Sequence, residues 1–290
     1  MTHSLTRREL EDLVGTITAE VVRQVKPAAW VQAGSSPKTT SKDQMCEGCP
    51  HNPGPAVLDP KTIRLTADVR ALAALIDHTL LRPEATESQV ERLCDEALKM
   101  GFAAVCVNPF WVPVVAAKLR GSRVRVATVA GFPFGCTSTA AKRAEAEAAV
   151  VAGAQEVDMV MNIGAMKSGD AARVESDIRG VVEVCHARGA AVKVIIENGY
   201  LTNEEKVLAS KMVRRAGAEF VKTATGFGPS GATEADVRLM RETVGPTMGV
   251  KAAGGVRTLG DALRMLQAGA TRLGASASLS ILAEAAALMN

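Results

Sequence analysis

The chain has 290 residues, of which 47% are hydrophobic and 3% aromatic, and its 34 basic and 31 acidic side chains leave a net charge of +3. This length allows one large domain or two small ones. The balanced charge, without a Lys/Arg cluster, argues against nucleic-acid binding, and the lack of a signal-peptide core or of about 18 consecutive apolar residues argues against secretion and membrane insertion. We therefore expect a cytosolic protein whose cysteines are mostly thiols, with Cys94, Cys106, Cys136 and Cys185 packed in the core.

Residues 1–26 predict one amphipathic helix. Thr6-Arg7-Arg8-Glu9 fits a capping box, and apolar residues follow with a period of about 3.6 at Leu10, Leu13, Val14, Ile17, Val21 and Val25. Such a helix is marginal in water by itself, so its apolar stripe should pack against its own domain, a second subunit or another protein. The form Glu-Leu-x-x-Leu-Val-x-x-Ile resembles the encapsulation peptides of bacterial microcompartments, which implies a location inside such a compartment and shell or cargo proteins as partners of residues 1–26.

Residues 27–60 predict a flexible linker. Half of the chain's 12 prolines fall in this segment, mixed with Gly, Ser, Thr and Lys. Within it, Cys46-Glu-Gly-Cys49-Pro-His51 offers three potential metal ligands, but a closed zinc site needs four and no second pair follows at finger spacing. Unpaired thiols are therefore expected ahead of a metal or cluster site.

From residue 61 to residue 290, apolar runs alternate with helical patterns, which is typical of parallel strands joined by crossover helices. The predicted strands are 75–79, 103–108, 124–131, 157–162, 191–198, 220–226, 249–255 and 272–276. The predicted helices include 87–100, 138–152, 203–216, 234–243 and 259–268. Eight such units predict a TIM (β/α)8 barrel. A doubly wound sheet is the alternative, although no G-x-G-x-x-G follows the first strand.

Chemistry in a TIM barrel lies at the C-terminal ends of the strands, and the period of two along a strand separates inward from outward positions. The predicted strands place Lys193 and Glu197 on one face of the fifth strand, Lys222 in the sixth and Lys251 in the seventh, while the fourth adds Asp158. We expect these three lysines and two carboxylates to meet inside the barrel.

A cluster of this kind can activate an amine. A free lysine with a pKa near 10.4 is neutral in only about four molecules in ten thousand at pH 7. A second ammonium and a low-dielectric surrounding can lower that pKa by about 3 units. Lys222 beside Lys251 is therefore a candidate nucleophile, and Asp158 is a candidate proton shuttle held by Lys193. The alternative is that Asp158 and Lys193 only neutralise each other.

Glycines at the ends of the last strands suggest a phosphate site, because backbone N–H groups bind phosphate at this position in many barrels. They also have a simpler explanation as turn residues. The candidates are Gly254 and Gly255, Gly274 and Ser276, the segment Thr225-Gly226-Phe-Gly228, and Arg257 as an additional charge.

The motifs of residues 62–288 resemble those of the deoxyribose-phosphate aldolase family. They are Ile76-Asp-His-Thr-Leu80, Ala104-Val-Cys106-Val-Asn108-Pro, Glu156-Val-Asp158, Asn162-Ile-Gly-Ala, Val192-Lys-Val-Ile-Ile-Glu197, Phe220-Val-Lys222-Thr-Ala-Thr-Gly226 and Val250-Lys251-Ala-Ala-Gly-Gly255-Val-Arg-Thr258. The resemblance implies that Lys222 forms a Schiff base with acetaldehyde and that Lys251 lowers the pKa of Lys222. It also implies that Asp158 exchanges protons with help from Lys193 and a water molecule.

The resemblance further implies reversible cleavage of 2-deoxy-D-ribose 5-phosphate to D-glyceraldehyde 3-phosphate and acetaldehyde, without metal or organic cofactor, in a homo-oligomer, for which a dimer is the guess. The implied pocket residues are Asp77, Thr79 and Cys106, and those around the sugar phosphate are Thr225, Gly226, Gly254, Gly255, Gly274 and Ser276. Departures from the family pattern are Asn198 in Glu197-Asn198-Gly199, Ala224, and the segment Ser276-Ala-Ser-Leu. Another Schiff-base lyase and a non-catalytic scaffold barrel are the alternatives, although a non-catalytic barrel would not need both Lys222 and Lys251.

Overall fold

The computed structural model describes residues 66–288 and, in the N-terminal segment, the single residue Thr16, which is helical and exposed. The other residues of the predicted helix 1–26 and the whole linker 27–60, with Cys46 and Cys49, lie outside the described residues. The predictions for both segments stay predictions.

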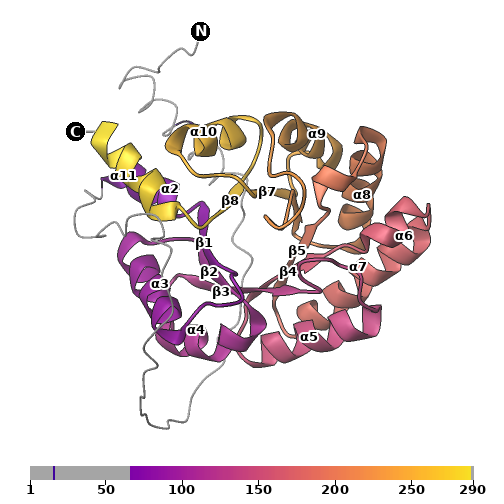
Figure 1. The fold of residues 1–290 in the computed structure, drawn as a ribbon, viewed down its shortest axis with the longest axis horizontal. Coiled ribbons are helices and arrows are strands. Elements are labelled where there is room, and N and C mark those ends of the chain that lie inside the picture. Colours follow the sequence, from indigo (N-terminus) through magenta and orange to yellow (C-terminus); the bar gives the residue numbers. More distant parts are fainter. Residues whose placement is uncertain (1–15, 17–65, 289–290) are drawn as a thin grey trace.

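Eight parallel strands close into a barrel in chain order, as Figure 1 shows. The strands are β1 (Ile76–Leu80), β2 (Ala104–Val107), β3 (Arg125–Ala130), β4 (Glu156–Val160), β5 (Ala191–Ile195), β6 (Phe220–Lys222), β7 (Gly249–Ala253) and β8 (Arg272–Ala275). The residue range of each strand overlaps that of a predicted strand, and β8 pairs with β1 to complete the ring. The predicted TIM (β/α)8 barrel is confirmed, and the doubly wound sheet is wrong.

The helices form an outer ring around the strands (Figure 1). They are α2 (Ala67–Ala73), α3 (Glu87–Met100), α4 (Val112–Lys118), α5 (Thr139–Val151), α6 (Ile163–Lys167), α7 (Ala171–His186), α8 (Asn203–Ala216), α9 (Glu234–Val244), α10 (Leu259–Gln267) and α11 (Ser278–Leu288), with 3-10 turns at Pro109–Trp111 and Asn198–Tyr200. Helices α3 and α8 have the predicted bounds, and both end at a left-handed glycine, Gly101 and Gly217. None of the helices in this part of the chain is both long and apolar enough to cross a bilayer.

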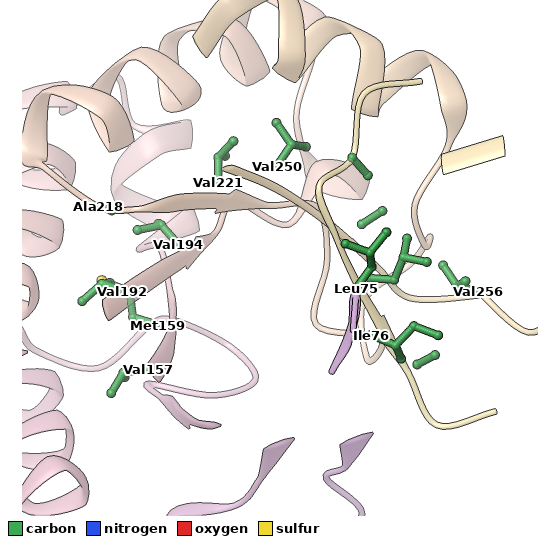
Figure 2. Packing of buried hydrophobic residues seen from close by; sticks show 14 of the residues in the cluster. Leu75, Ile76, Val157, Met159, Val192, Val194, Ala218, Val221, Val250 and Val256 are labelled. Carbon is green, nitrogen blue, oxygen red and sulfur yellow. The ribbon is translucent and has the colours of Figure 1, made fainter. Parts of the chain in front are cut away.

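The strands separate two kinds of side chain by their period of two. Residues that face outward, such as Val157, Val192 and Val221, belong to the main hydrophobic core between strands and helices. Figure 2 shows Val221 and Val250 between their strands and the surrounding helices. The inward face carries small apolar residues on β2 and β3 and charged residues on the other strands. The barrel interior is therefore where the polar chemistry lies.

Strands β5 and β6 end earlier than predicted. Strand β6 stops at Lys222, after which the Thr223 hydroxyl donates to the Ala253 carbonyl oxygen at 2.8 Å. Strand β5 stops at Ile195, and Glu197 has a φ of 53°, a left-handed conformation that is uncommon for a residue other than glycine. The period of two therefore does not reach Glu197. Its predicted place on the face of Lys193 is wrong, because its carboxylate accepts a hydrogen bond from the backbone N–H of Thr225 at 3.1 Å.

Candidate active site

Asp158 lies at the centre of three lysines. The strand register pairs Asp158 with Lys193 on β5 and pairs Lys222 with Lys251 on β7. Lys193 Nζ donates to Asp158 Oδ1 at 2.7 Å, while Lys222 Nζ and Lys251 Nζ both donate to Asp158 Oδ2 at 2.7 Å. All four side chains are buried. The four predicted catalytic residues thus meet in a single cluster.

The amine of Lys222 is shifted toward its neutral form. Burial lowers its pKa, the carboxylate of Asp158 opposes this effect, and the ammonium of Lys251 adds to the lowering. The direction is the predicted one, but burial contributes more than the neighbouring lysine. A neutral amine is the form that attacks a carbonyl carbon.

The other members of the cluster are held in their charged forms. Although burial opposes it, the carboxylates of Asp158 and Asp77 raise the pKa of Lys251. Burial likewise opposes the charge on Lys193, but Asp158 and Glu156 raise its pKa. Burial would raise the pKa of Asp158, yet the three lysines hold it well below its usual value. Lys222 is thus the lysine of the cluster with a lowered pKa.

Glu156 and Arg272, for which the sequence predicted no role, join the cluster from the N-terminal ends of β4 and β8. Arg272 Nη1 donates to Asp77 Oδ1 at 2.7 Å and to Glu156 Oε2 at 3.2 Å. Lys193 Nζ lies 2.7 Å from Glu156 Oε2. The period of two already held this signal, because Glu156 lies two residues before Asp158 on β4. Asp77, predicted to line the pocket, is fully buried between Lys251 and Arg272.

Thr79 and Cys106 lie on neighbouring strands, where the register pairs them. The Thr79 hydroxyl donates to the backbone oxygen of Asp77 at 2.8 Å. Cys106 is fully buried, and burial raises the pKa of its thiol to about 11, so that it is uncharged at neutral pH. With Ala104 and Ala127 it forms a small apolar wall on β2 and β3, across the barrel from β6 and β7.

The predicted phosphate residues fall at the ends of β6, β7 and β8. Gly254 and Gly255 follow β7 with φ angles of 89° and 80°, and the last residue of β7 pairs with Gly274. A Cβ at position 274 would lie 3.1 Å from Cε of Lys251, so the glycine leaves room for that side chain. Ser276 is exposed between β8 and the first turn of α11.

Thr225 and Gly226 follow β6, and their surroundings differ from those of the other phosphate candidates. The Thr225 hydroxyl donates to Glu197 Oε2 and accepts from the N–H of Phe227 at 3.0 Å, so it is engaged within the protein. Arg257 is exposed, and its backbone N–H donates to Asp261 at 3.1 Å. Gly226 has a φ of 88° and ends this segment as a turn residue.

A pocket of about 210 Å³ opens beside the ends of β5 and β6. Its walls include the exposed aromatic rings of Phe134, Tyr200 and Phe227 and the buried side chain of Glu197. The second carboxylate oxygen of Glu197, Oε1, has no hydrogen-bond partner in the structure. Sequence reasoning did not predict this pocket, because it is formed by loops that are distant along the chain.

Within residues 66–288, the structure places no group of three His, Cys, Asp or Glu side chains in an arrangement that could hold a metal ion.

Comparison with known proteins gives concordant matches. The sequence pattern of the DeoC/LacD family aldolase matches residues 71–284. A protein of Aciduliprofundum boonei named deoxyribose-phosphate aldolase is 55% identical over 215 residues, which are 74% of this chain and 97% of that protein. The protein of the same name from Streptococcus pneumoniae serotype 19F is 57% identical over 207 residues, 71% of this chain and 93% of that protein. Among solved structures, the tetrameric deoxyribose phosphate aldolase of Aeropyrum pernix has a TM-score of 0.70 at 34% identity, covering 74% of this chain and 90% of that chain.

Proposed function

Because this chain belongs to the DeoC/LacD family of aldolases, we propose that it cleaves 2-deoxy-D-ribose 5-phosphate reversibly to D-glyceraldehyde 3-phosphate and acetaldehyde through a Schiff base on Lys222. The observation that carries this proposal is a buried lysine with a lowered pKa, Lys222, in contact with Asp158 and beside a second lysine that keeps its charge. This pair is the arrangement that a lysine nucleophile needs at neutral pH.

In the cleavage direction, the neutral amine of Lys222 attacks the aldehyde carbon of the open-chain sugar, and loss of water gives the imine. The hydroxyl at C3 then loses its proton, the C2–C3 bond breaks, and its electrons move into the imine to form an enamine while C3 becomes the aldehyde of glyceraldehyde 3-phosphate. Protonation at C2 and hydrolysis release acetaldehyde and restore Lys222. Asp158, whose Oδ2 accepts from Lys222, is placed to take and return protons, assisted by Lys193.

The two ends of the substrate would meet different surroundings. The small apolar wall of Ala104, Cys106 and Ala127 suits the two carbons that leave as acetaldehyde. At the other end, the backbone N–H groups of Gly254, Gly255 and Gly274, with Ser276 before α11, suit the phosphate. Because the Thr225 hydroxyl is occupied by Glu197, Thr225 and Gly226 would shape this site through their backbone.

Borohydride trapping tests the proposal. Borohydride added with 2-deoxyribose 5-phosphate or with acetaldehyde should reduce the imine to a stable adduct, and peptide mass spectrometry should locate it on Lys222. The matched control is the same reaction without a carbonyl compound. Absence of an adduct, or an adduct on Lys193 or Lys251, would contradict the assignment.

The barrel is further proposed to act in a homo-oligomer. The support is the Aeropyrum pernix relative, which its description calls tetrameric. The dimer expected from the sequence and this tetramer are both homo-oligomers, and the proposal does not fix the number of subunits.

We also propose that residues 1–26 direct the barrel into a bacterial microcompartment by binding a shell or cargo protein. The support is the period of the apolar residues Leu10, Leu13, Val14 and Ile17, together with the Pro-rich segment 27–60 that separates the helix from the barrel. A fusion of residues 1–26 to a fluorescent protein should form foci in cells that build microcompartments. A fusion with Leu13→Asp and Ile17→Asp should stay diffuse. If the unmodified fusion is diffuse too, the helix folds back or pairs between subunits instead.

A further inference from the structure

Six charged side chains inside the barrel form a closed ring in which positive and negative charges alternate. We call it the charge ring. Going around it, the contacts are Arg272 to Glu156 at 3.2 Å, Glu156 to Lys193 at 2.7 Å, Lys193 to Asp158 at 2.7 Å, Asp158 to Lys251 at 2.7 Å, Lys251 to Asp77, and Asp77 to Arg272 at 2.7 Å. The side chains are buried, except for Arg272, which is 15% exposed and lies 5.3 Å from the ring centroid of Phe220.

The charge ring is neutral, because three cations face three carboxylates. Lys222 is not a member of the charge ring, but its Nζ contacts Asp158 Oδ2 at 2.7 Å. A neutral Lys222 leaves the buried cluster with no net charge, whereas an ammonium at this position leaves a net charge of +1. Burying an uncompensated charge is costly, so neutrality of the ring favours the amine.

We infer that Glu156 and Arg272 are positioning residues that set the protonation state of Lys222 from the base of the barrel. Neither lies at the C-terminal mouth of the barrel, where substrate enters, since each is the first residue of its strand, β4 or β8. They act by fixing Lys193 and Asp77, which in turn contact or face Asp158. The inference rests on the proposed role of Lys222 and extends it to two residues that do not touch the reacting atoms.

The other strands add few charges that could replace this control. The ionisable groups that act on Lys222 are Asp158 on β4, Lys251 on β7 and the uncharged thiol of Cys106 on β2, and the remaining ring members contact Asp158 or Lys251 or the residues next to them in the ring. Strand β3 presents Ala127 and Val129 to the interior. Within the described barrel, the protonation state of Lys222 therefore depends on the net charge of the charge ring.

Opposite charge changes at the two residues test the inference. Glu156→Gln removes one negative charge, so the ammonium of Lys222 becomes less favourable and the acid limb of kcat/KM against pH should move down by roughly one pH unit. Arg272→Met removes one positive charge and should move the same limb up by roughly one pH unit. The double variant restores neutrality, so its limb should return toward that of the wild type. The pH dependence of borohydride trapping with acetaldehyde should shift in parallel.

Matched variants separate charge from packing. Arg272→Lys keeps the charge and should keep the wild-type pH profile, even where it lowers stability. Arg264→Met removes an exposed arginine paired with Asp261 and Glu234 and should leave the profile unchanged. Circular dichroism checks folding. If Arg272→Met does not fold, the near-isosteric Glu156→Gln tests the inference by itself, through the downward shift of the acid limb of kcat/KM.

Three results would be informative in different ways. Unchanged limbs, or shifts of Glu156→Gln and Arg272→Met in the same direction, overturn the inference. A wild-type protein that forms no borohydride adduct contradicts the proposed function instead, and this control is run first. Shifts of opposite sign with restoration in the double variant support the charge ring as the feature that favours the neutral amine of Lys222.

Discussion

Lys222→Met should reduce kcat/KM for cleavage of 2-deoxyribose 5-phosphate by at least about 10⁴-fold and abolish the borohydride adduct. Methionine has nearly the length of lysine but no amine, so the imine cannot form. Asp158 still contacts Lys193 and Lys251, so the surroundings of the missing nucleophile stay charged and paired. The measurement is the rate of aldehyde release together with mass spectrometry of the trapped protein.

The same substitution should leave stability unchanged or slightly increase it. The neutral form of Lys222 is already favoured by burial, and replacing a buried polar group by an apolar one of similar shape is often neutral or stabilising. Loss of activity with an unchanged free energy of unfolding would therefore separate catalysis from folding. Residual turnover close to that of the wild type would exclude Lys222 as the nucleophile.

Lys142, a buried lysine that does not belong to the active-site cluster, provides the matched control. Lys142 is fully buried and donates to Asp177 at 2.6 Å and to the Val160 carbonyl oxygen at 2.9 Å, outside the charge ring. Lys142→Met leaves the Asp177 carboxylate buried without its cation, which should cost about 3–5 kcal/mol of stability. The protein that remains folded should keep wild-type kcat. Lys222→Met should thus lower the rate and preserve stability, whereas Lys142→Met should lower stability and preserve kcat.

The sequence sufficed for the barrel and for the centre of the site, because both depend on short-range patterns. Alternating strands and helices predicted the eight units, and the period of two placed Lys222, Lys251, Lys193 and Asp158 inward. Both patterns are local, since each strand is only three to six residues long. Caps such as the left-handed Gly101 are local in the same sense.

The sequence failed where contacts between distant strands decide the structure. Strand β6 ends at Lys222, and Thr223 next to it bonds the carbonyl of Ala253, 30 residues away. The left-handed turn at Glu197 depends in the same way on Thr225. The partners of Arg272 lie 195 and 116 positions away, and such pairs follow from barrel closure rather than from local pattern. The pairing of Asp77 with Arg272 and Lys251 follows from barrel closure in the same way.

Lys251→Leu should lower the rate at pH 7 by about 100-fold and shift the pH optimum toward alkaline values. Lys251 is a cation next to Lys222, since Asp158 and Asp77 raise its pKa against the effect of burial. Without it, the charge ring holds three carboxylates and two cations, so an ammonium on Lys222 becomes favourable. The resulting rise in the pKa of Lys222 lowers the fraction of neutral amine at pH 7, and part of the rate should return at alkaline pH.

Lys251→Arg separates the charge of this residue from proton transfer by it. Arginine keeps the positive charge beside Asp158 and Asp77 but does not lose its proton in proteins. If Lys251 acts as a fixed charge, the arginine variant should keep the acid limb of the wild type and lose activity only through fit, about tenfold or less. If Lys251 also relays protons, both variants should lose rate equally at neutral pH, and the arginine variant should not recover at alkaline pH. A leucine variant with an unchanged pH profile would exclude the role as a fixed charge, because Lys222 would then owe its lowered pKa to burial alone, and an unchanged rate as well would exclude the relay.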